Sequence, residues 1–163
     1  MDTVIETVTD RDFKDAMGRF LTGVTIVSIM REDRSAYGLT VNSFASVSLK
    51  PRLVLWSLIK TNTHADAFAK AERFSIAMLS HDQEALCTRF ASDVDDRFDG
   101  VSWHKSENDL PILDGALTVL ECQSYAQYDG GDHIIFIGEI IAIHQGQNDQ
   151  KPMSYYSGKV NQI

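Results

Sequence analysis

Short apolar stretches that alternate with polar residues dominate the hydrophobic pattern of this chain, and helical spacing is confined to short segments. The predicted strands are residues 24–29, 37–42, 53–59, 74–79, 116–128 and 133–143, the last two joined by a Gly130-Gly131 turn. The predicted helices are residues 10–19, 64–70 and 82–90, capped by Asp10, Thr61-Asn62-Thr63 and Ser80. Because regular strand–helix alternation is absent, we expect a mainly β fold with short helices, an antiparallel barrel or sandwich.

The alternation between residues 38 and 49 inverts at Ser43 and Phe44, which predicts a bend or bulge there. Trp56 lies at the centre of the apolar run that follows, and we expect it to pack in the core. Residues 93–110 are acidic and irregular, and no strand is predicted in them.

Length and charge restrict the possible functions. A chain of 163 residues predicts a single domain over residues 1–163. With 15 basic and 23 acidic residues the net charge is −8, which argues against binding to nucleic acid or to an anionic membrane. The two cysteines, the polar N-terminus and the lack of a long apolar run predict a cytoplasmic protein with reduced thiols.

Motifs for metal, hydrolytic and phosphate-loop chemistry are missing from the sequence. None of the five histidines has another His or a Cys at metal-ligand spacing, so no metal site is predicted. Residues 93–100 resemble a calcium loop superficially, but the glycine comes at the wrong position and Arg97 occupies a ligand place. Cys87 fits a small buried hydrophobe better than a nucleophile. The remaining possibility is that the protein binds a small ligand through backbone groups, hydroxyls and amides.

Three clusters are candidates for such binding, and each has a simpler interpretation. The polar row within residues 40–46 fits the edge of a flat heterocycle, or a strand half-exposed to water. Residues 60–64 fit a phosphate site at a helix N-terminus, or an ordinary capped helix with a solvated lysine. In Gly131-Asp132-His133 the aspartate could orient the imidazole of a functional histidine, or the two residues could belong to a surface turn.

Taken together and in order, several segments resemble the short-chain flavin reductases. The resemblance covers about residues 13–156, nearly the whole chain. The segments that carry it include Thr22-Gly23-Val24-Thr25-Ile26-Val27, Gly38-Leu39-Thr40-Val41-Asn42-Ser43-Phe44-Ala45-Ser46, Arg89-Phe90-Ala91, Arg97-Phe98, Leu113-Asp114-Gly115-Ala116 and Gly131-Asp132-His133. Many members of the family have a small or aliphatic residue at the position of Trp56, so the tryptophan is a departure from the family pattern.

The resemblance implies a homodimeric FMN-binding split β-barrel that reduces FMN, FAD or riboflavin with NADH or NADPH. Many members hand the reduced flavin to a partner monooxygenase. The implied flavin-ring residues are Thr40, Val41, Asn42, Ser43, Ala45 and Ser46. The implied ribityl and phosphate residues are Ser57, Lys60, Asn62, Thr63, Arg89, Phe90 and Ala91, with Tyr156 near the pocket mouth. His133 matches the histidine linked to nicotinamide binding, and is the expected catalytic residue.

This interpretation explains the lack of an acid–base pair, because hydride transfer between two bound rings mainly requires that the protein position them. Two alternatives stay open. The chain could be a non-catalytic flavin-binding or carrier protein on the same barrel, or a corrin-linked reductase of the same fold. The context of His133 distinguishes the first alternative, since only an enzyme that uses nicotinamide should need it.

Overall fold

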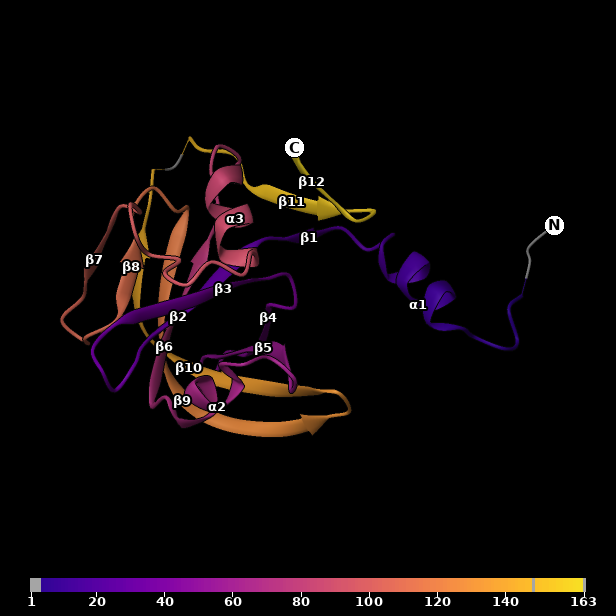
Figure 1. The fold of residues 1–163 in the computed structure, drawn as a ribbon, viewed down its shortest axis with the longest axis horizontal. Helices are drawn as coiled ribbons and strands as arrows, with labels where there is room; N and C mark the ends of the chain where they lie inside the picture. The colour runs from indigo at the N-terminus through magenta and orange to yellow at the C-terminus, as the bar shows by residue number, and fades with distance from the viewer. Residues whose placement is uncertain (1–3, 148, 163) are drawn as a thin grey trace.

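The computed structural model describes residues 4–147 and 149–162. The helices in this part of the chain are α1 (Asp10–Met17), α2 (Ala65–Lys70) and α3 (Glu84–Ala91). The strands are β1 (Thr22–Gly23), β2 (Thr25–Met30), β3 (Ala36–Val41), β4 (Ala45–Ser48), β5 (Leu53–Ile59), β6 (Arg73–Met78), β7 (Trp103–Lys105), β8 (Pro111–Leu113), β9 (Thr118–Gly130), β10 (His133–Gln145), β11 (Met153–Tyr156) and β12 (Lys159–Gln162). The prediction of a mainly β fold with short helices is confirmed (Figure 1).

The largest sheet has seven strands in the order β3-β2-β6-β9-β10-β5-β4, and its paired strands are antiparallel. Its two edge strands, β3 and β4, are consecutive along the chain and are joined by residues 42–44. The two edges of the sheet therefore come together at this corner, which is the bend that the inverted pattern at Ser43 and Phe44 predicts. The corner also lies outside both strand ladders.

Strands β2, β3, β5, β6, β9 and β10 enclose one aromatic core around Trp56, whose side chain is fully buried. The Trp56 ring stacks on Phe136, with ring centroids 4.4 Å apart, and meets Phe68 and Phe74 edge-on. Full burial of a large apolar side chain stabilises a fold by about 1.5–3 kcal/mol. The prediction that Trp56 packs in the core is confirmed. A second buried cluster, which includes Phe90 and Met153, lies under α3.

The helices begin at residues other than those predicted. Thr9 rather than Asp10 caps α1, because its hydroxyl and the Asp12 carboxylate form a reciprocal capping box. No side chain caps α2 or α3. Ser80 is held instead by a bridge to Pro152 and by a hydrogen bond from its hydroxyl to Asp82, so α3 begins only at Glu84.

Two short hairpins lie in segments where no strand was predicted. β7 pairs with β8 inside the acidic segment 93–110 and just beyond it, and β11 pairs with β12 near the C-terminus. Both depend on contacts with distant parts of the chain: the Ser75 hydroxyl donates to the Pro111 carbonyl, and β11 also pairs with β1. Such non-local contacts leave no periodic signal in a local stretch of sequence.

Helix α1 projects away from the strands (Figure 1), and none of its residues is buried. The predicted apolar face of this segment is therefore exposed: Phe13 is 61% exposed and Met17 51%, and the following Phe20 is 67% exposed. None of the helices in the described part of the chain has the length and apolar character needed to cross a membrane.

Candidate functional site

A cavity of about 380 Å³ opens at the corner where β3 leads into β4. Two further cavities, of about 810 Å³ and 330 Å³, meet it there, since Asn42 lines all three. Volumes in this range are typical of sites for small molecules and cofactors. The residues that line the 380 Å³ cavity, called here the corner cavity, are Leu39, Thr40, Val41, Asn42, Ser43, Ser57, Leu58, Ile59, Asn62, Phe90, Ala91, Asp93, Arg97 and His133.

The structure brings most of the predicted site residues to this corner. Those that line the corner cavity are Thr40, Val41, Asn42, Ser43, Ser57, Asn62, Phe90, Ala91 and His133. Ala45 lines the adjoining 810 Å³ cavity, together with Phe44 and residues of α1. Ser46, Lys60, Thr63, Arg89 and Tyr156 are not among the residues that line either cavity.

The predicted hydroxyl row is used largely to build the wall. The Thr40 hydroxyl donates to the Cys87 carbonyl at 2.8 Å, which fixes α3 against β3. The Ser43 hydroxyl accepts from the Ser57 N–H at 3.0 Å and donates to the Ser57 carbonyl at 3.2 Å, which ties the corner to β5. The exposed Asn42 amide and the backbone of residues 42–44, which lies outside both ladders, remain to meet a ligand.

Arg97 is a wall residue for which the sequence suggested no role. Its side chain is 9% exposed, and its guanidinium donates to the Ser92 and Gly38 carbonyls and to the Tyr37 hydroxyl at 2.9–3.0 Å. Among the described residues lining the corner cavity, Arg97 alone has a permanent positive charge. The only sequence signal for it was its place in the Arg97-Phe98 segment.

Arg89, expected near a phosphate, points elsewhere. Its guanidinium donates to the Arg97 carbonyl at 2.8 Å and to the Asp96 carbonyl at 2.9 Å. In this arrangement Arg89 secures the backbone that carries Arg97, and Arg97 in turn lines the cavity.

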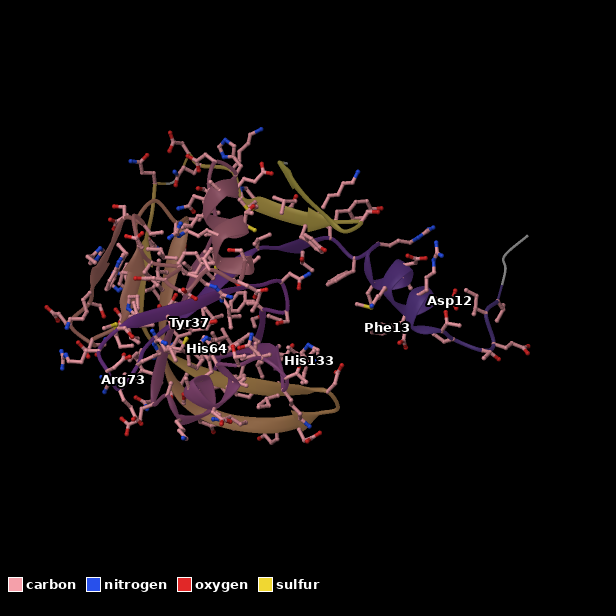
Figure 2. The ribbon with its side chains drawn as sticks, in the orientation of Figure 1. Asp12, Phe13, Tyr37, His64, Arg73 and His133 are labelled. Atoms are coloured by element: carbon pink, nitrogen blue, oxygen red, sulfur yellow. The ribbon has the colours of Figure 1, made fainter. Side chains whose placement is uncertain are left out.

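Tyr37 and His64 connect the wall to the start of α2, and Figure 2 shows them side by side. Their ring centroids are 3.9 Å apart, and the guanidinium of Arg97 lies 5.1 Å from the Tyr37 ring. Burial lowers the pKa of His64 below its ordinary value, and the nearby Arg31 and Arg97 charges lower it further. His64 is therefore a neutral stacking partner at neutral pH.

The turn that precedes α2 makes its own hydrogen bonds. The Asn62 side chain accepts from the His64 N–H at 2.9 Å, and the Asn62 carbonyl accepts from the Ala65 N–H at 3.0 Å. Thr63 lines a separate cavity of about 730 Å³ with Arg31 and His64. Within this turn, Asn62 rather than Thr63 faces the corner cavity.

The β9–β10 turn brings His133 to the corner cavity, and this turn with the neighbouring Lys60–Asp129 pair is called here the rim of the site. His133 Nδ1 lies 2.7 Å from an Asp132 carboxylate oxygen, and Lys60 Nζ lies 2.6 Å from Asp129 Oδ2. The hydrogen bond with His133 lowers the pKa of Asp132, and the hydrogen bond from Lys60 lowers the pKa of Asp129. Because an ionised carboxylate only accepts, Nδ1 of His133 carries a proton and Nε2 is left to contact a ligand.

The two adjacent tyrosines of β11 lie differently with respect to the cavities. Tyr155 lines both neighbouring cavities, whereas Tyr156 is 45% exposed. Successive side chains of a strand point to opposite faces, so only one of the two neighbours can face the site.

Comparison with known proteins gives a consistent set of relatives. Residues 17–163 match the model of the flavin reductase like domain. The chain is 41% identical over 149 residues to the FMN reductase (NADH) SmoA of Agrobacterium fabrum, covering 91% of this chain and 83% of that protein. It is 43% identical over 130 residues to the reductase component of the flavin-dependent trigonelline monooxygenase of Acinetobacter baylyi, covering 80% of this chain but 42% of that protein.

Among solved structures, the NADH:FAD oxidoreductase SgcE6 of Streptomyces globisporus, in complex with NAD and FAD fragments, superposes with a TM-score of 0.89. It is 34% identical, and the match covers 98% of this chain and 97% of that one. The flavin reductase PheA2 superposes with a TM-score of 0.86 at 34% identity, covering 96% of this chain and 99% of that chain.

Proposed function

Because this chain belongs to the flavin reductase-like family, as its sequence segments indicated, we propose that it is an NAD(P)H:flavin oxidoreductase that works at the corner cavity. The observation that carries this proposal is the meeting of three cavities at Asn42, with His133 on the rim of one of them. The names of the relatives support both ligands, a flavin and NADH.

The residues present fit a flavin. The corner cavity offers backbone groups at residues 42–44, the Asn42 amide and apolar walls from Leu39 and Phe90. A flat heterocycle with carbonyl and ring-nitrogen edges needs donors and acceptors of this kind within an apolar slot. Arg97 adds a positive charge that would favour an anionic ligand, although the acidic Asp93 lines the same cavity.

When bound, the flavin supplies the hydride-accepting chemistry, and the protein supplies orientation and electrostatics. N–H groups of residues 42–44 would orient the ring edge and favour negative charge on it. The His133 ring, held through Nδ1 by Asp132, leaves Nε2 to contact the nicotinamide carboxamide. No group on this path has to move a proton, which agrees with the lack of an acid–base pair.

We infer that the reduced flavin goes to a partner monooxygenase, since several relatives are named as reductase components of such systems. The competing possibility is a flavin carrier without activity. Steady oxidation of NADH in the presence of excess FMN tests the two: turnover above that of FMN and NADH alone supports the reductase, and its absence overturns it.

The finer architecture is part of the same proposal: residues 1–163 form one flavin-binding domain, a split barrel whose sheet edges meet at residues 42–44. A second copy covers α1, whose exposed Phe13 and Met17 line the 810 Å³ cavity. In analytical ultracentrifugation the wild-type protein should sediment as a dimer, and the double variant Phe13→Glu with Met17→Glu should sediment as a monomer. The two buried free cysteines support a cytoplasmic site of action.

A further inference from the structure

The β9–β10 turn holds a carboxylate against the lysine expected to meet the flavin phosphate. Lys60 Nζ lies 2.6 Å from Asp129 Oδ2, while Asp129 Oδ1 accepts from the Gly131 N–H at 3.1 Å. The Lys60 backbone N–H also donates to the Asp132 carbonyl at 2.9 Å. Asp129 is therefore positioned by its own turn and faces Lys60.

The Lys60–Asp129 ion pair can be broken at little cost, so that Lys60 can bind another anion. The Lys60 side chain is 40% exposed and that of Asp129 is 78% exposed, so water and salt screen their attraction. Lys60 follows Ile59, which lines the corner cavity, and lies two residues before Asn62, which lines it too. A phosphate group at the cavity mouth would compete with Asp129 for the same ammonium group.

Resting on the proposed function, we propose that Asp129 is a resident counterion that the flavin phosphate displaces from Lys60. One anion then replaces another on Lys60, so the phosphate contributes less to affinity than an unpaired lysine would allow. Asp129 thereby sets the preference of the protein for phosphorylated over unphosphorylated flavin. The weaker hold suits a flavin that has to leave after reduction.

The substitution Asp129→Asn isolates this effect. The amide oxygen can still accept from the Gly131 N–H, but the negative charge that competes for Lys60 is gone. From the strength of exposed ion pairs, FMN should bind the variant about two- to fivefold more tightly. Riboflavin, which has the same ring and no phosphate, should bind with unchanged affinity.

The experiment is fluorescence titration of the full-length protein with FMN and with riboflavin. Glu107→Gln is the matched control, because it removes one exposed acidic charge from the β7–β8 connection instead of the cavity rim. Lys60→Gln and the double variant complete a cycle, in which Asp129→Asn should have no effect once Lys60 is gone.

Selective tightening for FMN that depends on Lys60 supports the inference. Equal changes for FMN and riboflavin, the same gain from Glu107→Gln, an effect that persists without Lys60, or unchanged FMN affinity overturns it. Unchanged riboflavin affinity also verifies that the variant is folded. If the wild-type protein binds neither flavin, the proposed function itself fails, and this outcome is distinct from the others.

Discussion

The two sides of the corner cavity are held by different forces. On the wall of the cavity, which β3, β5, the end of α3 and Arg97 form, hydroxyls and a guanidinium make buried or half-buried hydrogen bonds to backbone carbonyls, as Thr40, Ser43 and Arg97 do. On the β9–β10 rim, the corresponding contacts are exposed ion pairs, Lys60 with Asp129 and His133 with Asp132. The wall is pre-organised, because breaking its hydrogen bonds would leave buried polar groups without partners. The exposed groups of the rim can change partners at little cost in free energy.

This difference separates two tasks of a flavin reductase. A rigid wall keeps a flat ring in one orientation, which hydride transfer requires. An exchangeable rim lets charged ligands enter and leave. Substitutions in the wall should therefore reduce stability first, and substitutions on the rim should alter ligand binding at constant stability.

The largest effect is expected from Arg97→Met. The change leaves the Gly38 and Ser92 carbonyls and the Tyr37 hydroxyl without their donor, and buried groups left this way should lower the free energy of unfolding by about 3 kcal/mol. Urea denaturation measures the loss. Arg89→Met, which removes bonds to two carbonyls from a less buried side chain, should cost less; an equal loss for both variants would contradict the special role of Arg97.

Ser43→Ala comes next. It leaves the Ser57 N–H without the acceptor that it has in the corner, which should lower the free energy of unfolding by about 1–2 kcal/mol. Because the corner loosens, FMN and riboflavin should both bind more weakly. A variant that keeps its stability and binds both flavins normally would show that this hydroxyl does not organise the wall.

His133→Ala tests the rim. We expect about a tenfold loss in kcat/KM for NADH, equivalent to about 1.4 kcal/mol, with unfolding unchanged because the side chain is exposed. His104→Ala is the matched control, since His104 also pairs with an aspartate, Asp114 at 2.9 Å, but does not line the cavity. Unchanged affinity and rate in His133→Ala would remove its assigned role.

The smallest effect is a pH dependence that arises at His64. Its pKa is lowered in the folded protein, so between the folded value and the ordinary value of 6.5 the unfolded chain binds more protons. Above pH 6.5 the free energy of unfolding is therefore not reduced by protonation of His64, and it decreases as the pH falls through that window. Denaturation of the wild type and of His64→Gln at several pH values measures the difference, and identical pH profiles would argue against it.

Much of this molecule was predictable where local pattern decides the structure. The six predicted strands, the bend at Ser43 and Phe44 and the burial of Trp56 follow from short apolar runs and from the alternation of polar and apolar residues. The β7–β8 and β11–β12 hairpins did not, because distant segments hold them in place: Ser75 donates to Pro111 next to β7, and β1 pairs with β11. The exposed face of α1 was also beyond the sequence, since periodicity predicts an apolar face but not what covers it.

Most of the site residues predicted from the sequence lie together at one corner of the fold, but the sequence did not indicate what each of them does there. The polar row within residues 40–46 was expected to face the ligand, yet the Thr40 and Ser43 hydroxyls mainly fix the wall. Arg97 was missed because a charged residue in an acidic loop gives no signal that it is buried. Tyr155, which the sequence did not single out, lines the neighbouring cavities, and its side chain points to the opposite face of β11 from that of Tyr156.

Anaerobic stopped-flow mixing of the FMN-loaded protein with NADH measures hydride transfer to the bound flavin. We expect the absorbance of oxidised flavin to be lost in a fast phase that saturates with NADH and is slowed in His133→Ala but not in His104→Ala. Loss of absorbance no faster than that of free FMN with NADH would contradict the proposed reductase function.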